Sequence, residues 1–107
     1  MGKILGENRM SEFRITRHKG FQIDFENGWC ISVQFGAGNY CDNHDREFDF
    51  EKEMDMLKST NAEIGIFNPK DELIRHPDYG SKDTVKGWVT PDELVHFINW
   101  TAEQEGK

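Results

Sequence analysis

The strongest constraint on the fold is the alternation of residue types between positions 21 and 35. Over 21–26, and again over 29–35, every odd-numbered residue is aromatic, Ile or Val, whereas the even-numbered ones are polar or Cys. A period of two is typical of β-strands that bury one face. Phe13 and Ile15 continue the pattern upstream. The sequence therefore predicts a meander of three antiparallel strands.

The length of the turn between the second and third of these strands decides their register. A two-residue Asn-Gly turn would place Phe25 opposite Cys30, so apolar residues would face polar ones and the buried face would be split. A three-residue loop over 26–28 instead places Phe25 opposite Trp29, and both strands then bury one common face. We therefore predict a type I turn followed by Gly28 in the left-handed conformation, which forms a bulge.

The rest of the chain supplies further strands and one helix. Thr90 precedes Pro91 and, three residues on, Glu93, a capping-box pattern that marks a helix start. The residues that follow at helical spacing, Leu94, Phe97, Ile98 and Thr101, form a stripe that should lie on the sheet. We also expect strands over 62–67, 72–75 and 85–89, a loop over 36–45, and a strand over 48–54, where a helical turn is the alternative.

These elements predict an α+β domain: a curved antiparallel sheet of about five strands, with the C-terminal helix packed on one face. The chain has 107 residues, which fits one domain. We place that domain at 12–105, after a loose lead-in over 1–11. No apolar run is long enough to span a membrane, and the start lacks the apolar core of a signal peptide, so we expect a cytoplasmic protein.

Charge is spread unevenly along the chain. The net charge is −7, and residues 42–55 carry seven Asp and Glu against one Arg and one Lys, a local net of −5. Such a block is a solvated face or an electronegative patch that docks on a basic partner. In the second case the contacting residues would be Asp42, Asp45, Glu47, Asp49 and Glu51. The acidic balance disfavours extensive binding to a nucleic-acid backbone.

A small-ligand site is a second candidate. The loop after residue 35 is rich in Gly, where Asn39 offers a donor and an acceptor and Tyr40 offers a stacking face. Arg14, Arg17 and Lys19 near the start could neutralise a phosphate. Together they would suit a nucleotide-type ligand, although the loop lacks the known glycine-rich nucleotide motifs. The alternative is a glycine-rich turn that only redirects the chain.

Metal binding and catalysis receive less support. Cys41, Asp42, His44 and Asp45 lie within five residues, but no CxxC or HxxxH pair accompanies them, so we assign no metal site, no cofactor and no catalytic residue. A metal-dependent hydrolase that uses His44 and the acids of 41–49 is kept as an alternative. Three Trp residues, Trp29, Trp88 and Trp100, belong either to the core or to an interface, and exposure of Trp88 or Trp100 would favour self-association or binding of a partner.

Three segments resemble small proteins of bacteriophages and prophages: FENGWCISVQFGAGNYCDN (25–43), TNAEIGIFNP (60–69) and VKGWVTPDELVHFI (85–98). The resemblance implies an accessory protein in the cytoplasm of an infected bacterium, where such proteins block host defences by binding an enzyme or sequestering a nucleotide signal. It carries no catalytic residues over.

We therefore predict a non-enzymatic protein that acts by stoichiometric binding. The first hypothesis is counter-defence by sequestration of a nucleotide-type signal. The second is inhibition of a host defence protein whose basic site is blocked by the acidic stretch 42–55. In either case we expect a homo-oligomer, because a chain this small often pairs subunits to form a pocket large enough for a ligand.

Overall fold

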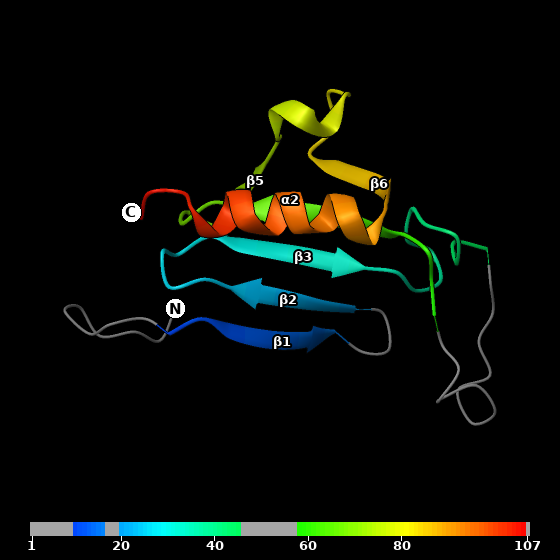
Figure 1. Ribbon diagram of the computed structural model, residues 1–107, viewed down its shortest axis with the longest axis horizontal. Coiled ribbons are helices and arrows are strands. Elements are labelled where there is room, and N and C mark those ends of the chain that lie inside the picture. Colours follow the sequence, from blue (N-terminus) through cyan, green and yellow to red (C-terminus); the bar gives the residue numbers. More distant parts are fainter. Residues whose placement is uncertain (1–9, 17–19, 46–57, 107) are drawn as a thin grey trace.

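The computed structural model of the chain describes residues 10–16, 20–45 and 58–106. Its elements are β1 (Glu12–Thr16), β2 (Gly20–Asp24), β3 (Cys30–Gln34), β4 (Ala62–Phe67), β5 (Leu73–Ile74), the 3-10 helix η1 (Pro77–Tyr79), β6 (Val85–Val89) and α2 (Pro91–Ala102). All strand pairs are antiparallel, in the order β1-β2-β3-β4-β5, and β6 also pairs with β4 (Figure 1). The predicted α+β class, with a curved sheet and one C-terminal helix, is confirmed.

The register of the central hairpin follows the alternation in the sequence. Ile23 lies opposite Ile31, and Phe25 donates its backbone N–H to the Trp29 carbonyl at 2.8 Å. The predicted three-residue loop is therefore confirmed, and Gly28 has φ 91°, the left-handed conformation that a side chain disfavours.

Strand β4 carries two short strands on its outer edge. β5 pairs with its end, where Phe67 lies opposite Leu73, and β6 pairs with its beginning, where Ala62 lies opposite Val89. The β4–β6 pairing slips by one residue, so that Gly87 and Trp88 together oppose Glu63. This is a β-bulge, and the sequence analysis did not predict it.

The helix covers the apolar face of the middle strands. Thr90 caps it, and the reciprocal contact with Glu93 completes the predicted capping box. Ile31, Val33, Ile64, Ile66 and Phe97 are buried together. Burial of each large apolar side chain contributes about 1.5–3 kcal/mol, so this contact is the main stabilising layer. Trp100 packs edge-on against Trp29, with ring centroids 5.6 Å apart, and is therefore part of this layer.

The far end of α2 is held by the hairpin turn. The Asn27 side-chain amide donates to the backbone carbonyls of Thr101, Ala102 and Gln104, at 2.9–3.2 Å. These are carbonyls that a helix leaves without partners at its C-terminal end. The turn of the hairpin and the end of the helix thus stabilise one another.

Some sequence predictions fall outside the described residues. The strand expected over 48–54 lies there, as does most of the lead-in 1–11. Within the described residues, no helix is long and apolar enough to cross a membrane.

Candidate functional site

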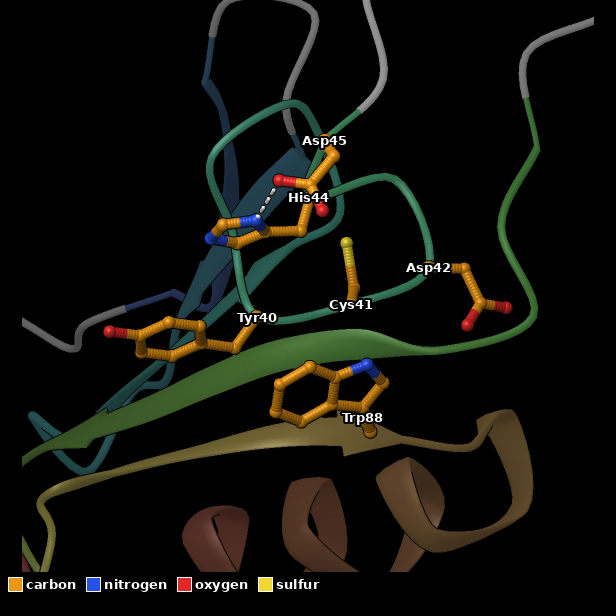
Figure 2. A pocket seen from close by; sticks show the side chains of 6 residues that line it. All are labelled: Tyr40, Cys41, Asp42, His44, Asp45 and Trp88. Carbon is orange, nitrogen blue, oxygen red and sulfur yellow. Dashed lines mark hydrogen bonds and ion pairs between the residues drawn. The ribbon is translucent and has the colours of Figure 1, made fainter.

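An open pocket lies between the 36–45 loop and strand β6. It has a volume of about 590 Å³ and is lined by Tyr40, Cys41, Asp42, His44, Asp45 and Trp88 (Figure 2). Five of these six residues come from the loop, and one comes from the bulge in β6. We call this the aromatic pocket.

The loop is held in shape by its own hydrogen bonds. Gly38 donates its backbone N–H to the His44 carbonyl at 2.9 Å, and His44 donates to the Cys41 carbonyl at 3.0 Å. The buried side chain of Asn43 donates to the Phe35 carbonyl at 2.8 Å, which anchors the loop to the end of β3. A loop tied at these points presents its side chains in a preorganised arrangement, so less ordering entropy is lost when a ligand binds.

The loop docks directly on β6. The Trp88 backbone N–H donates to the Tyr40 carbonyl at 2.8 Å. At Gly87 a Cβ atom would lie only 2.7 Å from the Tyr40 Cβ, so glycine is required there by the close approach of the two chains. The position of Tyr40 is therefore fixed by β6 as well as by its own loop.

Trp88 holds a strained backbone conformation. Its φ is 52°, which is rare for a bulky residue, and its side chain is 56% exposed. The bulge aims the indole outward, toward the 36–45 loop, as Figure 2 shows. Backbone strain of this kind persists only where the surrounding packing holds the residue in place, and it is common at functional sites.

Three rings form a short stack at the pocket. The Tyr40 ring lies 5.7 Å from the His44 ring, nearly parallel to it, and 5.9 Å from the Trp88 ring, at 22° to it (centroid distances). These spacings correspond to offset stacking. Tyr40 is itself 49% exposed, so the stack presents aromatic surface to solvent.

Two carboxylates stand beside this aromatic surface. Asp42 accepts hydrogen bonds from the side chains of Thr60 and Asn61, which lower its pKa, the Thr60 contact most. Asp45 is almost fully exposed, and one of its oxygens lies 2.8 Å from His44 Nδ1. Because an ionised carboxylate only accepts, we place the proton of the neutral imidazole on that nitrogen.

This combination suits a positively charged or planar group. Exposed Tyr and Trp faces attract cations through the ring quadrupole, and ionised carboxylates add ordinary charge attraction. A guanidinium satisfies both, because it stacks on rings and is bound by carboxylates. A phosphate would instead be repelled by Asp42 and Asp45.

Three of the residues proposed for nucleotide binding, Arg14, Asn39 and Tyr40, are described by the structure. Asn39 accepts the Gly36 N–H at its side-chain oxygen, and its amide donates to Glu63, so both ends of the side chain contribute to loop structure. Arg14 forms an ion pair with Asp24 at 2.6 Å. Tyr40 lines the pocket. Arg17 and Lys19 lie outside the described residues.

The acidic residues proposed for partner binding are described only in part. Asp42 and Asp45 line the aromatic pocket, whereas Glu47, Asp49 and Glu51 lie outside the described residues. Sequence analysis left open whether Trp88 belongs to the core or to an interface; the side chain is exposed, and its place beside Tyr40 was not predicted. His44 was considered only as a candidate metal ligand and hydrolase residue, and the ring stack that it makes with Tyr40 was missed.

Both cysteines are buried and free. Burial, above all, raises the pKa of the Cys30 thiol to about 12, so the nucleophilic thiolate is not formed at neutral pH. Cys41 is 2% exposed, and its thiol points toward the Gly36 carbonyl, 3.8 Å away. The two residues fill space under the sheet and the loop.

A second polar cluster joins η1 to α2. His76, Asp78 and His96 bring ligand atoms within 4.8 Å of one another, a geometry that could hold a divalent metal with three protein ligands. Hydrogen bonds account for part of the arrangement: His76 Nδ1 accepts the Asp78 N–H at 2.9 Å, and His96 Nε2 lies 2.9 Å from an Asp78 oxygen, whereas the buried His76 Nε2 has no partner among the described residues. We assign the cluster a structural role. In the described part of the chain, the 41–45 loop brings no such group of three together.

Comparisons with protein-family models, with curated proteins and with solved structures give no match for this chain. Its candidate function therefore depends on the geometry of the site.

Proposed function

We propose that the chain is a stoichiometric binding protein that captures a basic protein surface, and that an arginine side chain of the partner enters the aromatic pocket. The observation that carries the proposal is the position of two exposed aromatic rings, Tyr40 and Trp88, beside the carboxylates of Asp42 and Asp45. This is the second of the two sequence-based hypotheses, and a specific pocket now supports it.

The energetics favour a cation at this place. A cation over an aromatic face gains about 0.5–2 kcal/mol, and the gain rises as water is excluded. The Asp42 carboxylate is held in place by Thr60 and Asn61, so its orientation costs little entropy on binding. The net charge of −7 adds long-range attraction, which raises the rate of encounter with a basic partner.

The nucleotide hypothesis has less support from the site. Its stacking residue, Tyr40, is available, but the Asn39 side chain bonds within the fold and Arg14 bonds to Asp24. Under the resemblance to phage proteins, the partner would be a host defence protein with a basic groove. That context stays a prediction.

Calorimetric titration tests the proposal. An octa-arginine peptide, an octa-lysine peptide and a panel of linear and cyclic nucleotides are titrated into the wild-type protein at low and high salt. We expect the arginine peptide to bind most tightly, with an affinity that falls as salt rises, since exposed charges are screened. Tight nucleotide binding with no arginine binding would overturn the proposal in favour of the alternative.

Variants separate a specific pocket from general negative charge. Asp42→Asn combined with Asp45→Asn should weaken the arginine peptide strongly, and Trp88→Gly should weaken it about 5–30-fold, the equivalent of about 1–2 kcal/mol. The control is Glu103→Gln at the C-cap of α2, which removes a charge from a residue that does not line the pocket. If Glu103→Gln weakens binding as much as one aspartate change does, the pocket is not the site.

A further inference from the structure

The outer edge of the sheet exposes apolar side chains. Strand β1 pairs with β2 on one side, and among the described residues no strand pairs with its other side. Phe13 is 71% exposed and Ile15 is 87% exposed, although both share the sheet face that α2 covers farther in (Figure 1). Edge strands of natural proteins are normally protected by charge, proline or bulges on that side, and β1 lacks such protection at these two positions.

In the part of the chain that the structure describes, the outer backbone groups of β1 have no strand partner. Because Phe25 donates its N–H to Trp29, the odd-numbered residues of β2 direct their backbone groups toward β3, and the even-numbered ones direct theirs toward β1. The partners of those even residues on β1 are Glu12, Arg14 and Thr16. The N–H and C=O groups of Phe13 and Ile15 therefore point out of the sheet, toward the open edge.

Charge at the edge is incompletely matched. Glu12 lies directly opposite Asp24, a like-charge cross-strand pair that destabilises a sheet. Arg14 neutralises Asp24 through contacts of 2.6 and 2.9 Å, and among the described residues no cation is paired with Glu12. A second β1 strand can bring one.

Only one antiparallel register between two β1 strands pairs the outward backbone groups and also places a cation opposite Glu12. With Phe13 opposite Phe13 of a second copy, Glu12 of each copy faces Arg14 of the other. A register centred on Arg14 would place the two Arg14 side chains opposite each other. A register centred on Glu12 would place the two Glu12 side chains opposite each other. A register centred on Ile15 leaves Glu12 away from Arg14.

We propose that the protein forms a two-fold symmetric dimer by antiparallel pairing of β1 with β1 of a second copy, centred on Phe13. The pairing gives hydrogen-bond partners to the outward backbone groups of Phe13 and places the two Phe13 rings side by side on one face. It also forms a row of alternating charges from Asp24 through Arg14 to Glu12 of the second copy. The exposed β1 edge of each copy is thereby covered by the other copy. Repulsion between the two net charges is screened beyond about 10 Å at 0.1 M salt.

Light scattering of the purified protein tests the dimer. The wild type should be a dimer at about 100 μM, well above a micromolar dissociation constant. Phe13→Lys should be a monomer, because it sets two ammonium groups face to face at the two-fold axis. The control is Val95→Lys on α2, which replaces another exposed apolar residue and should stay dimeric. A monomeric wild type, or a dimeric Phe13→Lys, would overturn the proposal.

Disulfide formation tests the register independently. In the proposed pairing the two Cα atoms at position 13 lie about 5.5 Å apart, within disulfide range, whereas those at position 15 are more than about 13 Å apart along the strand. Phe13→Cys should therefore form a linked dimer under mild oxidation, and Ile15→Cys should stay unlinked. The native cysteines are both buried, so they give little background. If Ile15→Cys forms a disulfide-linked dimer, or if neither variant does, the proposed register is wrong.

Discussion

Trp88 and Tyr40 are joined twice: the Trp88 backbone N–H donates to the Tyr40 carbonyl at 2.8 Å, and their rings stack with centroids 5.9 Å apart. The first contact fixes the relative position of loop and strand, and the second builds the exposed aromatic surface. Because Trp88 also has a positive φ, backbone strain and the proposed binding surface coincide at one residue.

Trp88→Gly should weaken binding with little change in stability. Glycine adopts a φ of 52° without steric cost, which returns about 1–2 kcal/mol, whereas loss of the ring contact with Tyr40 costs about 0.5–1.5 kcal/mol. We expect the free energy of unfolding to change by less than about 1 kcal/mol while the arginine peptide binds more weakly. Urea denaturation and calorimetry measure the two effects. A much larger loss of stability would mean that the indole is a structural side chain.

Gly87→Ala should lower both the stability and the binding affinity. The added Cβ would lie 2.7 Å from the Tyr40 Cβ and 3.0 Å from its carbonyl oxygen, so the loop must move away from β6. Overpacking of this kind typically costs about 1–3 kcal/mol. We expect lower stability in urea and weaker peptide binding together. The control is Gly38→Ala, where the Cβ would meet open space and only the φ of 86° is unfavourable. Wild-type binding by Gly87→Ala would show that the loop and β6 are not tightly coupled.

The fold was predictable where its signals are local. The alternation on both sides of Gly28 fixed the hairpin register, and the capping box at Thr90 fixed the start of α2, because each signal is complete within a few residues. The bulge at Trp88 has only the weak local signal of Gly87 inside a strand pattern, which the sequence analysis did not use. It depends on a carbonyl of Tyr40, which is 48 positions away in the chain, and the sequence around Trp88 alternates like an ordinary strand.

The candidate site was predictable only in part, for the same reason. Tyr40 and the acids after it stand out in the sequence, but their partner Trp88 is supplied by topology. Asn39 was expected to read a ligand, yet its side chain closes the loop and reaches Glu63, a contact between distant residues. The pairing of His96 with Asp78 is equally non-local.

Asn27→Asp should destabilise the fold more than Asn27→Ala. Both changes remove the amide that donates to three carbonyls at the end of α2, a loss of about 1–3 kcal/mol. Asp also places negative charge beside the negative end of the helix dipole. It does retain the oxygen that accepts the Trp29 N–H, so the turn itself is preserved. Thermal unfolding at neutral pH gives the ranking, and an Asn27→Asp variant that is as stable as Asn27→Ala, or more stable, would contradict it.

His76 should make stability depend on pH. The side chain is 3% exposed, and burial lowers its pKa; Asp78 opposes the shift and His96 adds to it. In the unfolded chain the ring titrates near pH 6.5. Below that pH the unfolded state binds a proton that the folded state does not, so stability falls as the pH drops through 6.5 toward the lower folded value. His76→Asn keeps a side chain able to accept the Asp78 N–H at the cap and removes the titration. Urea midpoints between pH 7.5 and 5 should therefore decline more steeply for the wild type than for this variant, and parallel curves would show that His76 does not couple protonation to folding.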